Sequence, residues 1–367
     1  MRLNRLLRRF LGRQPPAETH GPEPRRRGSV DHVIILDGTM SSLAEGQETN
    51  AGLTYRLLAE RGRVADLSLY YRAGIQWEEW RRAPAVITGR GINSHIRGAY
   101  GFLASRYRPG DRIFLFGFSR GAFAARSLAG VIDRVGLLKA EAATQRAVRE
   151  VYRHYTLAPD SVAARAFAAL HCHYESPIEM VGVWDTVKAL GWRLPVLWRF
   201  SLPNHDFHNH RLGATIQNGF HALALDETRE AYTPVLWDCN NRREGQHVEQ
   251  VWFRGTHGDI GGQLGGFSAA RPLSNIPLVW MLEKAEGCGL TLPAGWRARF
   301  PRDATAPSVG SWSGWGKTFL FRRRRKIGAD RSEAIHPTAL ATHPGLRLAE
   351  ASSNRPPSGS GVFAAPD

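Results

Sequence analysis

The stretch Gly117-Phe118-Ser119-Arg120-Gly121 follows the apolar run Ile113-Phe114-Leu115-Phe116 and precedes a run of mostly small residues from Ala122 to Gly130. This order predicts a strand, a very tight turn and a helix packed closely behind the turn. A serine at such a turn is held at a strained backbone angle, with its hydroxyl above the sheet edge. Gly117 and Gly121 are needed because a Cβ at either position would collide with the neighbouring strand or helix. The stretch therefore has the context of a G-x-S-x-G nucleophile elbow.

A nucleophilic serine needs a general base, and the base needs an acid that orients it. In α/β-hydrolases the acid and then the histidine follow the serine along the chain. A hydrophobic strand from Ile178 ends at Asp185, which places a carboxylate at the carboxyl edge of the predicted sheet. Another short strand runs into a glycine-rich loop that carries His257. We therefore predict Ser119 as the nucleophile, His257 as the base and Asp185 as the acid.

The assignment of Asp185 as the acid has two alternatives, another role for Asp185 and another residue as the acid. Asp185 is also suited to capping a following helix, as an aspartate at a strand-to-helix turn often does. Asp259 is a rival acid, but it stands only two residues from His257. We expect Asp259 instead to organise its own loop by accepting hydrogen bonds from the backbone amides of the Gly261-Gly262 turn.

Five segments, in the same order, resemble the bacterial α/β-hydrolase family of uncharacterised domain type 2235, which includes the catalytic domain of type VI secretion phospholipase effectors. The resemblance spans residues 30 to 290 of the chain. The matching segments are Leu36 to Thr39 (LDGT), Gly117 to Arg126 (GFSRGAFAAR), Gly182 to Val187 (GVWDTV), Ala224 to Trp237 (ALDETREAYTPVLW) and Trp252 to Gly262 (WFRGTHGDIGG). The elbow with its Arg-Gly-Ala is a specific match, whereas Asp-Gly-Thr alone is a weak one.

The resemblance implies an α/β-hydrolase-like fold, with a mostly parallel central sheet flanked by helices. It also implies ester hydrolysis, with phospholipid acyl esters as the substrate class. The oxyanion would be held by the backbone N–H of Arg120 and by a second donor at Gly38 or Thr39. Asp37 and Asp259 are expected to support the loops around the site. No cofactor and no metal ion are expected, and calcium dependence stays open.

The chain departs from the family pattern at the rim of the predicted site. Ser41 stands where the family usually has an asparagine. Gln263 and Leu264 stand where a third glycine and an aromatic residue are usual. Because none of these positions belongs to the predicted Ser-His-Asp set, the departures bear on substrate specificity and not on hydrolysis.

Three other functions stay open from the sequence. A phosphatase of the haloacid-dehalogenase type would need an aspartate two positions before Asp37, where Ile35 stands. A soluble esterase or thioesterase would use the same three residues on a different acyl substrate. A non-catalytic protein would bind anionic lipid or nucleic acid through a basic surface, and an intact Ser-His-Asp set argues against it.

The composition favours an anionic partner. The 367 residues include 49 Lys and Arg against 33 Asp and Glu, a formal net charge of +16. Lipid headgroups are the partner that this charge suggests, and a solvated arginine-rich surface is the plainer alternative. No nucleic-acid-binding motif is present, so nucleic acid is not expected. No apolar run reaches the length of about 18 residues that a membrane-spanning helix needs.

Two basic clusters are candidates for peripheral contact with an anionic membrane. Residues 1–13 place leucines and Phe10 on one helical face and arginines on the other. Such a helix lies on a membrane surface, docks on the domain or stays disordered, and it lacks the cleavage site of a secretory signal. The second cluster, Arg322-Arg323-Arg324-Arg325-Lys326, follows Trp312 and Phe321. Aromatic side chains beside arginines suit an interfacial segment.

The domain organisation is predicted from composition. We expect a basic segment and linker at residues 1–29, a catalytic domain at 30–290, a basic and aromatic extension at 291–339 and a disordered tail at 340–367. The aromatic, histidine-rich segment Trp192–His210 is a candidate lid or acyl pocket. The three scattered cysteines have no C-x-x-C spacing, which argues against zinc and disulfides and favours a cytoplasmic compartment.

Further elements of the catalytic domain are predicted from hydrophobic periodicity and turn signals. They are the strand His32–Leu36, the helix Gly52–Arg61, the strand Asp66–Tyr71, the helix Ile92–Tyr107 and the helix Leu273–Gly287. Strands that alternate with helices in this way are typical of a parallel sheet.

Overall fold

The computed structural model describes residues 28–62, 64–74, 90–187, 212–239, 244–312 and 320–346. Three predictions lie outside these residues. They are the amphipathic helix at 1–13, the candidate lid Trp192–His210 and the greater part of the predicted disordered tail.

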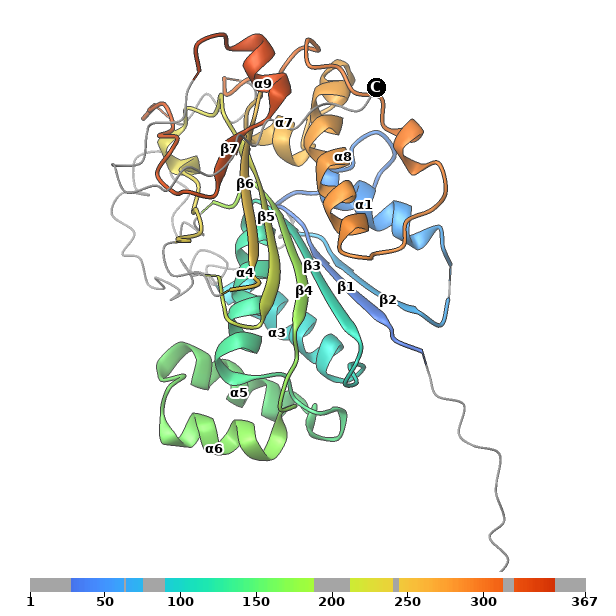
Figure 1. Cartoon of the computed structure of the whole chain (residues 1–367), viewed down its shortest axis with the longest axis vertical. Coiled ribbons are helices and arrows are strands. Elements are labelled where there is room, and N and C mark those ends of the chain that lie inside the picture. The colour runs from blue at the N-terminus through green and yellow to red at the C-terminus, as the bar shows by residue number, and fades with distance from the viewer. Residues whose placement is uncertain are drawn as a thin grey trace, which may run out of the picture.

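A seven-stranded, all-parallel sheet forms the centre of the described chain (Figure 1). Its strands lie in the order β2-β1-β3-β4-β5-β6-β7. They are β1 (Asp31–Leu36), β2 (Leu67–Arg72), β3 (Arg112–Phe118), β4 (Ile178–Trp184), β5 (Ile216–Ala224), β6 (His247–Phe253) and β7 (Glu333–Ile335). Because all strands run the same way, their carboxyl ends meet at one edge of the sheet.

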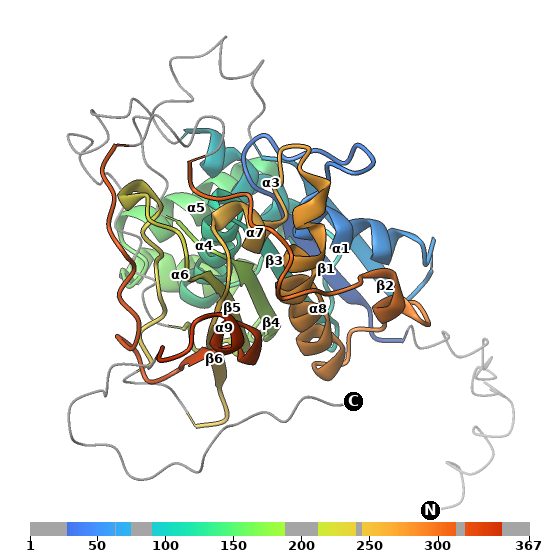
Figure 2. The ribbon, with the colours of Figure 1, turned by 90° about the horizontal axis from the view of Figure 1, so that it is seen from above.

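Helices cover both faces of this sheet (Figures 1 and 2). The α-helices are α1 (Asn50–Ala59), α3 (Arg90–Ala104), α4 (Arg120–Val135), α5 (Gln145–Leu157), α6 (Val162–His171), α7 (His257–Gly261), α8 (Arg271–Gly287) and α9 (Pro337–Thr342). The predicted fold class is therefore confirmed, an α/β-hydrolase-like arrangement of a parallel sheet between helical layers.

The apolar run of β1 fills both layers of the core. Ile34 and Leu36 join the apolar cluster of α3, α4 and α5 on one face. Val33 and Ile35 join the cluster of α1 and α8 on the other face. Successive side chains of a strand point to opposite faces, so a strand covered on both sides carries a nearly continuous apolar run, here Val33 to Leu36.

The elements predicted from periodicity are all present, with ends displaced by up to three residues. The predicted helix Gly52–Arg61, for example, is observed at Asn50–Ala59. It begins earlier because the side chain of Thr49 caps it, accepting a hydrogen bond from the backbone N–H of Gly52 at 2.9 Å. A threonine hydroxyl at this position satisfies one of the unpaired N–H groups of the first turn.

The C-terminal extension contributes to the same sheet. Glu333–Ile335 pair in parallel with Gln250–Trp252 of β6. The carboxylate of Glu333 also accepts a hydrogen bond from the indole N–H of Trp252 at 2.7 Å. The division predicted at residue 290 therefore does not coincide with a break in the sheet, and α9 crosses the predicted start of the tail at residue 340.

The strand order reverses at β1, which has β2 on one side and β3 on the other. The chain leaves β1 toward α1 on one face and leaves β3 toward α4 on the opposite face. In open α/β sheets, ligands bind outside the carboxyl ends of the strands at such a point. The register aligns the ends of β1, β3 and β4, so Asp37, Ser119 and Asp185 follow at the same edge.

Gly121 allows α4 to approach the end of β1 closely. A Cβ at this position would lie 2.0 Å from the carbonyl oxygen of Leu36 and 2.5 Å from that of Asp37. A Cβ on Gly117 would lie 2.5 Å from the carbonyl oxygen of Gly121. All three contacts are with backbone atoms, which cannot move aside as a flexible side chain can.

Replacing Gly121 by alanine should lower the free energy of unfolding by about 3 kcal/mol or more, because the backbone must move to admit the Cβ. Gly287→Ala in the last turn of α8 is the matched control, since no atom lies within 4 Å of its Cβ position. Alanine there should raise stability by up to about 1 kcal/mol. Denaturant unfolding measures both variants, and equal stabilities would contradict the close approach.

Candidate active site

Ser119, His257 and Asp185 form one hydrogen-bonded line at the carboxyl edge of the sheet. Nε2 of His257 lies 2.9 Å from Oγ of Ser119, and Nδ1 of His257 lies 2.6 Å from Oδ2 of Asp185. All three residues are buried, with Ser119 8%, His257 4% and Asp185 0% exposed. The structure thus brings together the residues predicted as nucleophile, base and acid, although 138 residues separate the serine from the histidine.

Ser119 stands in the turn between β3 and α4 with φ 59° and ψ −118°. A positive φ is uncommon for any residue with a side chain, and it costs on the order of 1–3 kcal/mol. The backbone N–H of Ser119 donates to the carbonyl of Trp184 at 3.0 Å, which fixes the turn to the end of β4. The side chain makes no capping hydrogen bond to α4. Its hydroxyl points to His257 instead.

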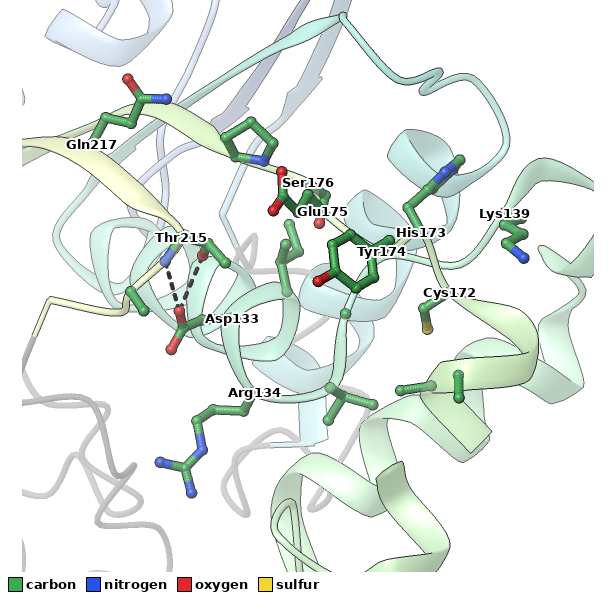
Figure 3. A pocket seen from close by; sticks show the side chains of 17 residues that line it. Asp133, Arg134, Lys139, Cys172, His173, Tyr174, Glu175, Ser176, Thr215 and Gln217 are labelled. Atoms are coloured by element: carbon green, nitrogen blue, oxygen red, sulfur yellow. Dashed lines mark hydrogen bonds between the residues drawn. The ribbon is translucent and has the colours of Figure 1, made fainter. Parts of the chain in front are cut away.

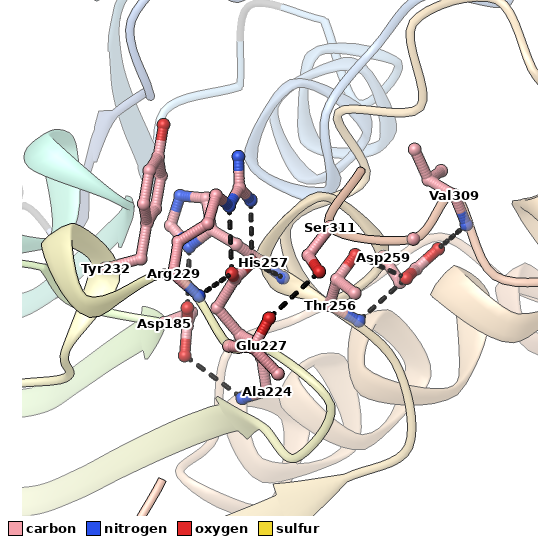
Figure 4. A network of polar contacts seen from close by, with 12 residues as sticks. Asp185, Ala224, Glu227, Arg229, Tyr232, Thr256, His257, Asp259, Val309 and Ser311 are labelled. Carbon is pink, nitrogen blue, oxygen red and sulfur yellow. Dashed lines mark hydrogen bonds and ion pairs between the residues drawn. The ribbon is translucent and has the colours of Figure 1, made fainter. Parts of the chain in front are cut away.

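His257 is the first residue of the short helix α7, whereas the sequence predicted it on an open glycine-rich loop. The helix forms because the side chain of Asp259 bonds Thr256, the residue just before the helix, as an acidic residue at the third helical position can do. Oδ2 of Asp259 accepts from the backbone N–H of Thr256 at 2.7 Å and from its hydroxyl at 2.8 Å (Figure 4). The helix end fixes the backbone from which the imidazole projects.

The prediction that Asp259 bonds the amides of the Gly261-Gly262 turn is wrong. Besides Thr256, its carboxylate accepts from the backbone N–H of Val309 at 2.9 Å and from the hydroxyl of Ser308 at 2.5 Å. Asp259 therefore supports the site by joining α7 to the C-terminal extension. It is not the acid that meets His257.

The imidazole of His257 packs against two aromatic rings. The ring centroids of Phe118 and Tyr232 each lie 4.8 Å from that of His257. The backbone N–H of His257 donates to Glu227 at 3.2 Å, and Glu227 accepts from the Arg229 guanidinium at 2.6 and 2.8 Å (Figure 4). No role was predicted for these residues from the sequence, although Glu227, Arg229 and Tyr232 lie in the segment before β6 that resembles the family.

The carboxylate of Asp185 is completely buried, and its backbone has a positive φ of 41°. Besides His257, it accepts from the backbone N–H of Ala224 at 3.0 Å. Arg325 donates to both oxygens, with Nη1 2.5 Å from Oδ1 and Nη2 2.9 Å from Oδ2. The side chain of Arg325 is only 4% exposed, so this residue does not belong to the interfacial surface predicted for Arg322 to Lys326. In a run of four arginines, the pattern cannot indicate which one turns inward.

The charges around the three residues suit proton transfer from the serine. Burial alone would raise the pKa of Asp185, but the Arg325 guanidinium and the hydrogen bond from His257 hold that pKa well below its ordinary range. Burial lowers the pKa of His257, and Asp185 opposes this shift. The imidazole is therefore neutral at neutral pH, as a general base must be.

Asp37 anchors the connection that follows β1. Burial raises its pKa, and hydrogen bonds to the carboxylate act in the opposite direction. These hydrogen bonds include those from the backbone N–H of Gly38 at 2.6 Å, the hydroxyl of Thr49 at 2.6 Å and the hydroxyl of Tyr71 at 2.7 Å. The connection is thereby tied to the start of α1 and the end of β2.

Of the two residues predicted to offer a second oxyanion donor, Thr39 is the better candidate. The N–H of Gly38 is directed to the carboxylate of Asp37. The carbonyl of Thr39 accepts a hydrogen bond from the side chain of Gln263 at 2.9 Å. Gln263 is one of the departures from the family pattern, and here it links the loop after α7 to the loop after β1.

A cavity of about 830 Å³ lies at the far end of α4 (Figure 3). Asp133 of α4 lines it and accepts hydrogen bonds from the backbone N–H and the hydroxyl of Thr215, at 2.8 and 3.1 Å. At a rise of 1.5 Å per residue, the helix separates Asp133 from Ser119 by about 20 Å. Ser119, His257 and Asp185 do not line this cavity, so it is not the candidate active site.

The described ranges contain no group of three or more His, Cys, Asp or Glu residues arranged to hold a metal ion. No helix among them combines the length and the apolar character needed to cross a bilayer. The three cysteines are not joined by disulfides, and burial raises the pKa of Cys172 to about 11, which makes it a poor nucleophile.

The fold and the site define an α/β-hydrolase-like protein with serine, histidine and aspartate side chains in contact at the edge of a parallel sheet. Residues 31–284 match the family described as "T6SS, Phospholipase effector Tle1-like, catalytic domain". The chain belongs to this family, as the motifs predicted.

This chain spans only about a third to a half of the length of the relatives that it matches. An uncharacterised protein of Saccharomyces cerevisiae is 30% identical over 229 residues, which are 56% of this chain and 32% of that protein. A crystal structure of an uncharacterised Pseudomonas aeruginosa protein has 15% identity and a TM-score of 0.39. That match covers 77% of this chain and 52% of the Pseudomonas aeruginosa chain. The structure of the Tle1 effector bound to the VgrG spike of the type 6 secretion system has 17% identity and a TM-score of 0.27. That match covers 64% of this chain and 51% of the effector chain.

His221 of β5 contacts Thr186, the residue after Asp185, and is expected to make stability depend on pH. Its Nε2 accepts from the backbone N–H of Thr186 at 3.1 Å, and burial lowers its pKa to about 3. The unfolded chain takes up a proton near pH 6.5 and the folded chain does not, so this contribution is complete above that pH and is lost below it.

The free energy of unfolding should therefore fall as the pH drops from 7 to 5. His221→Gln keeps an acceptor for Thr186 and cannot take up the proton, so it should remove up to about 1.4 kcal/mol per pH unit of this slope. Denaturant unfolding at several pH values measures it. A slope equal to that of the wild type would show that His221 is not the neutral buried group described.

Proposed function

We propose that this chain hydrolyses acyl ester bonds of phospholipids, with Ser119 as the nucleophile, His257 as the general base and Asp185 as the orienting acid. The observation that carries the proposal is the hydrogen-bonded line from Ser119 through His257 to Asp185 at a strained strand-to-helix turn. Family membership supports phospholipids as the substrate class.

In the proposed reaction, Oγ of Ser119 attacks the acyl carbonyl carbon while Nε2 of His257 takes the hydroxyl proton. Asp185 holds the ring with Nδ1–H toward its carboxylate and stabilises the imidazolium. The ester C–O bond then breaks, and His257 gives its proton to the leaving alcohol. Water attacks the acyl-serine with His257 as the base, which releases the fatty acid and restores Ser119.

The negative charge on the carbonyl oxygen needs donors that are already in place. The backbone N–H of Arg120 is one, because the first residue after the nucleophile opens α4 and the elbow directs its amide to the site. The backbone N–H of Thr39 is the other, held in place by Gln263 on the carbonyl of the same residue. This assignment gives the rim residue Gln263 a role in the reaction.

We also propose that the exposed part of the C-terminal basic cluster contacts anionic lipid. The ring of Trp312 is 58% exposed, and the Arg322 guanidinium stacks over it at 3.9 Å. Aromatic rings beside cationic side chains suit the headgroup region of a bilayer. The exposed basic residues next to this pair are Arg323, Arg324 and Lys326.

Purified wild type should release fatty acid from phospholipid vesicles, and Ser119→Ala should lower the rate by at least about a thousandfold. Ser105→Ala changes an exposed serine after α3 and is the matched control, expected to act as wild type. The assay compares anionic vesicles, zwitterionic vesicles and a short soluble p-nitrophenyl ester. Faster release from anionic vesicles is expected from the basic surface.

The three substrates separate the competing functions. Turnover of the soluble ester without release from either vesicle would replace the phospholipid assignment with a soluble esterase. Vesicle binding without serine-dependent turnover of any substrate would contradict hydrolysis and leave a lipid-binding protein. Ser119→Ala should still bind vesicles, since the proposed lipid contacts do not include the serine.

A further inference from the structure

Arg325 joins three parts of the candidate site. It donates to both carboxylate oxygens of Asp185, with Nη1 at 2.5 Å and Nη2 at 2.9 Å. The same two nitrogens also donate to the carbonyl of Ala224, at the end of β5, at 2.8 Å and to the carbonyl of Tyr232 at 2.6 Å. The ring of Tyr232 in turn packs against the imidazole of His257. One guanidinium thus contacts the acid, the strand beside it and the backbone of a residue that contacts the base.

The segment that carries Arg325, residues 320–336, is here called the C-terminal strap. It is held on both sides of the arginine. Before Arg325, the carbonyl of Phe321 accepts from the N–H of Glu230 at 3.1 Å, and the N–H of Arg323 donates to Thr228 at 2.7 Å. After it, β7 pairs with β6. The guanidinium therefore reaches Asp185 from a fixed backbone.

We propose that Arg325 is a positioning residue for the proposed hydrolysis, and that the C-terminal strap is part of the catalytic unit although the family match ends at residue 284. This inference rests on the proposed function. It names a residue that does not contact the reacting atoms but holds the acid that orients the base.

The physical reason is the buried charge of Asp185. A fully buried carboxylate is strongly destabilised unless it is paired and its oxygens are hydrogen-bonded. Two guanidinium nitrogens bonded to two oxygens also prevent rotation of the carboxyl group, because Arg presents its donors in a rigid planar fork. Oδ2 then stays directed at Nδ1 of His257, and Nε2 stays directed at Ser119.

The charge of Arg325 also affects the acid limb of the pH profile. Around the acid and the base lie Arg325 from the strap, His221 from β5, and Glu227 and Arg229 from the connection before β6. The guanidinium offsets part of the attraction between Asp185 and a protonated imidazole. Removing its charge should let His257 retain its proton to a higher pH.

The test uses Arg325→Lys and Arg325→Gln with the soluble p-nitrophenyl ester, so that membrane contact plays no part. Both variants should lower kcat by about tenfold or more with little change in KM, because neither side chain can bond both oxygens in the plane. In Arg325→Gln the acid limb of kcat/KM should also move up by about half a pH unit or more. Arg325→Lys keeps the charge and should leave the limb near its wild-type position.

Arg134→Gln is the matched control, because it removes an arginine from an exposed ion pair with Asp160 at the far end of α4. It should have the wild-type kcat and pH profile. Wild-type kcat in Arg325→Lys, measured on protein shown to be folded by circular dichroism, would overturn the positioning role. Wild-type kcat and acid limb in Arg325→Gln would overturn it as well.

Failure of the proposed function gives a different result. In that case the wild type itself shows no turnover that depends on Ser119. The comparison of wild type with Ser119→Ala reveals this failure without any Arg325 variant. Removing one partner of a buried ion pair is strongly destabilising, so Arg325→Gln is the variant at risk of unfolding. Arg325→Lys then decides the matter alone.

Discussion

The ionised carboxylate of Asp185, fully buried at the edge of the sheet, is the constraint on which the rest of the site depends. An isolated buried charge costs several kcal/mol, so the fold must bring donors to it. They come from three separate places, the end of β5 at Ala224, the start of α7 at His257 and the C-terminal strap at Arg325. Segments far apart in the sequence meet because one charge needs all of them.

The same edge stores backbone strain. Ser119 and Asp185 both have positive φ, each at a cost on the order of 1–3 kcal/mol. Each is held by a hydrogen bond from its own N–H to the neighbouring strand, to Trp184 and Ala222 respectively. The parallel sheet supplies this support because its strand ends are aligned in register. A serine hydroxyl and a carboxylate are thereby fixed on opposite sides of one imidazole.

The sequence predicted the sheet, the elbow and the three contacting residues because each follows a local rule. The alternation of apolar strands and helices, the two glycines around Ser119 and the placement of Asp185 after a strand are all visible over short windows. The short helix at His257 was missed although its capping pair, Thr256 and Asp259, stands at local spacing. What no short window shows is that Asp259 also bonds the distant loop at residues 308–309. Arg325 was missed because an inward arginine looks like its exposed neighbours in the sequence.

The most direct test of the account is covalent labelling with a serine-directed fluorophosphonate, followed by peptide mapping with mass spectrometry. Such reagents react with a serine whose hydroxyl is activated by a base and whose oxyanion site is formed. We expect one labelled peptide that contains Ser119, with labelling that is lost in His257→Gln. Labelling of a different serine, or no labelling of folded protein, would contradict it.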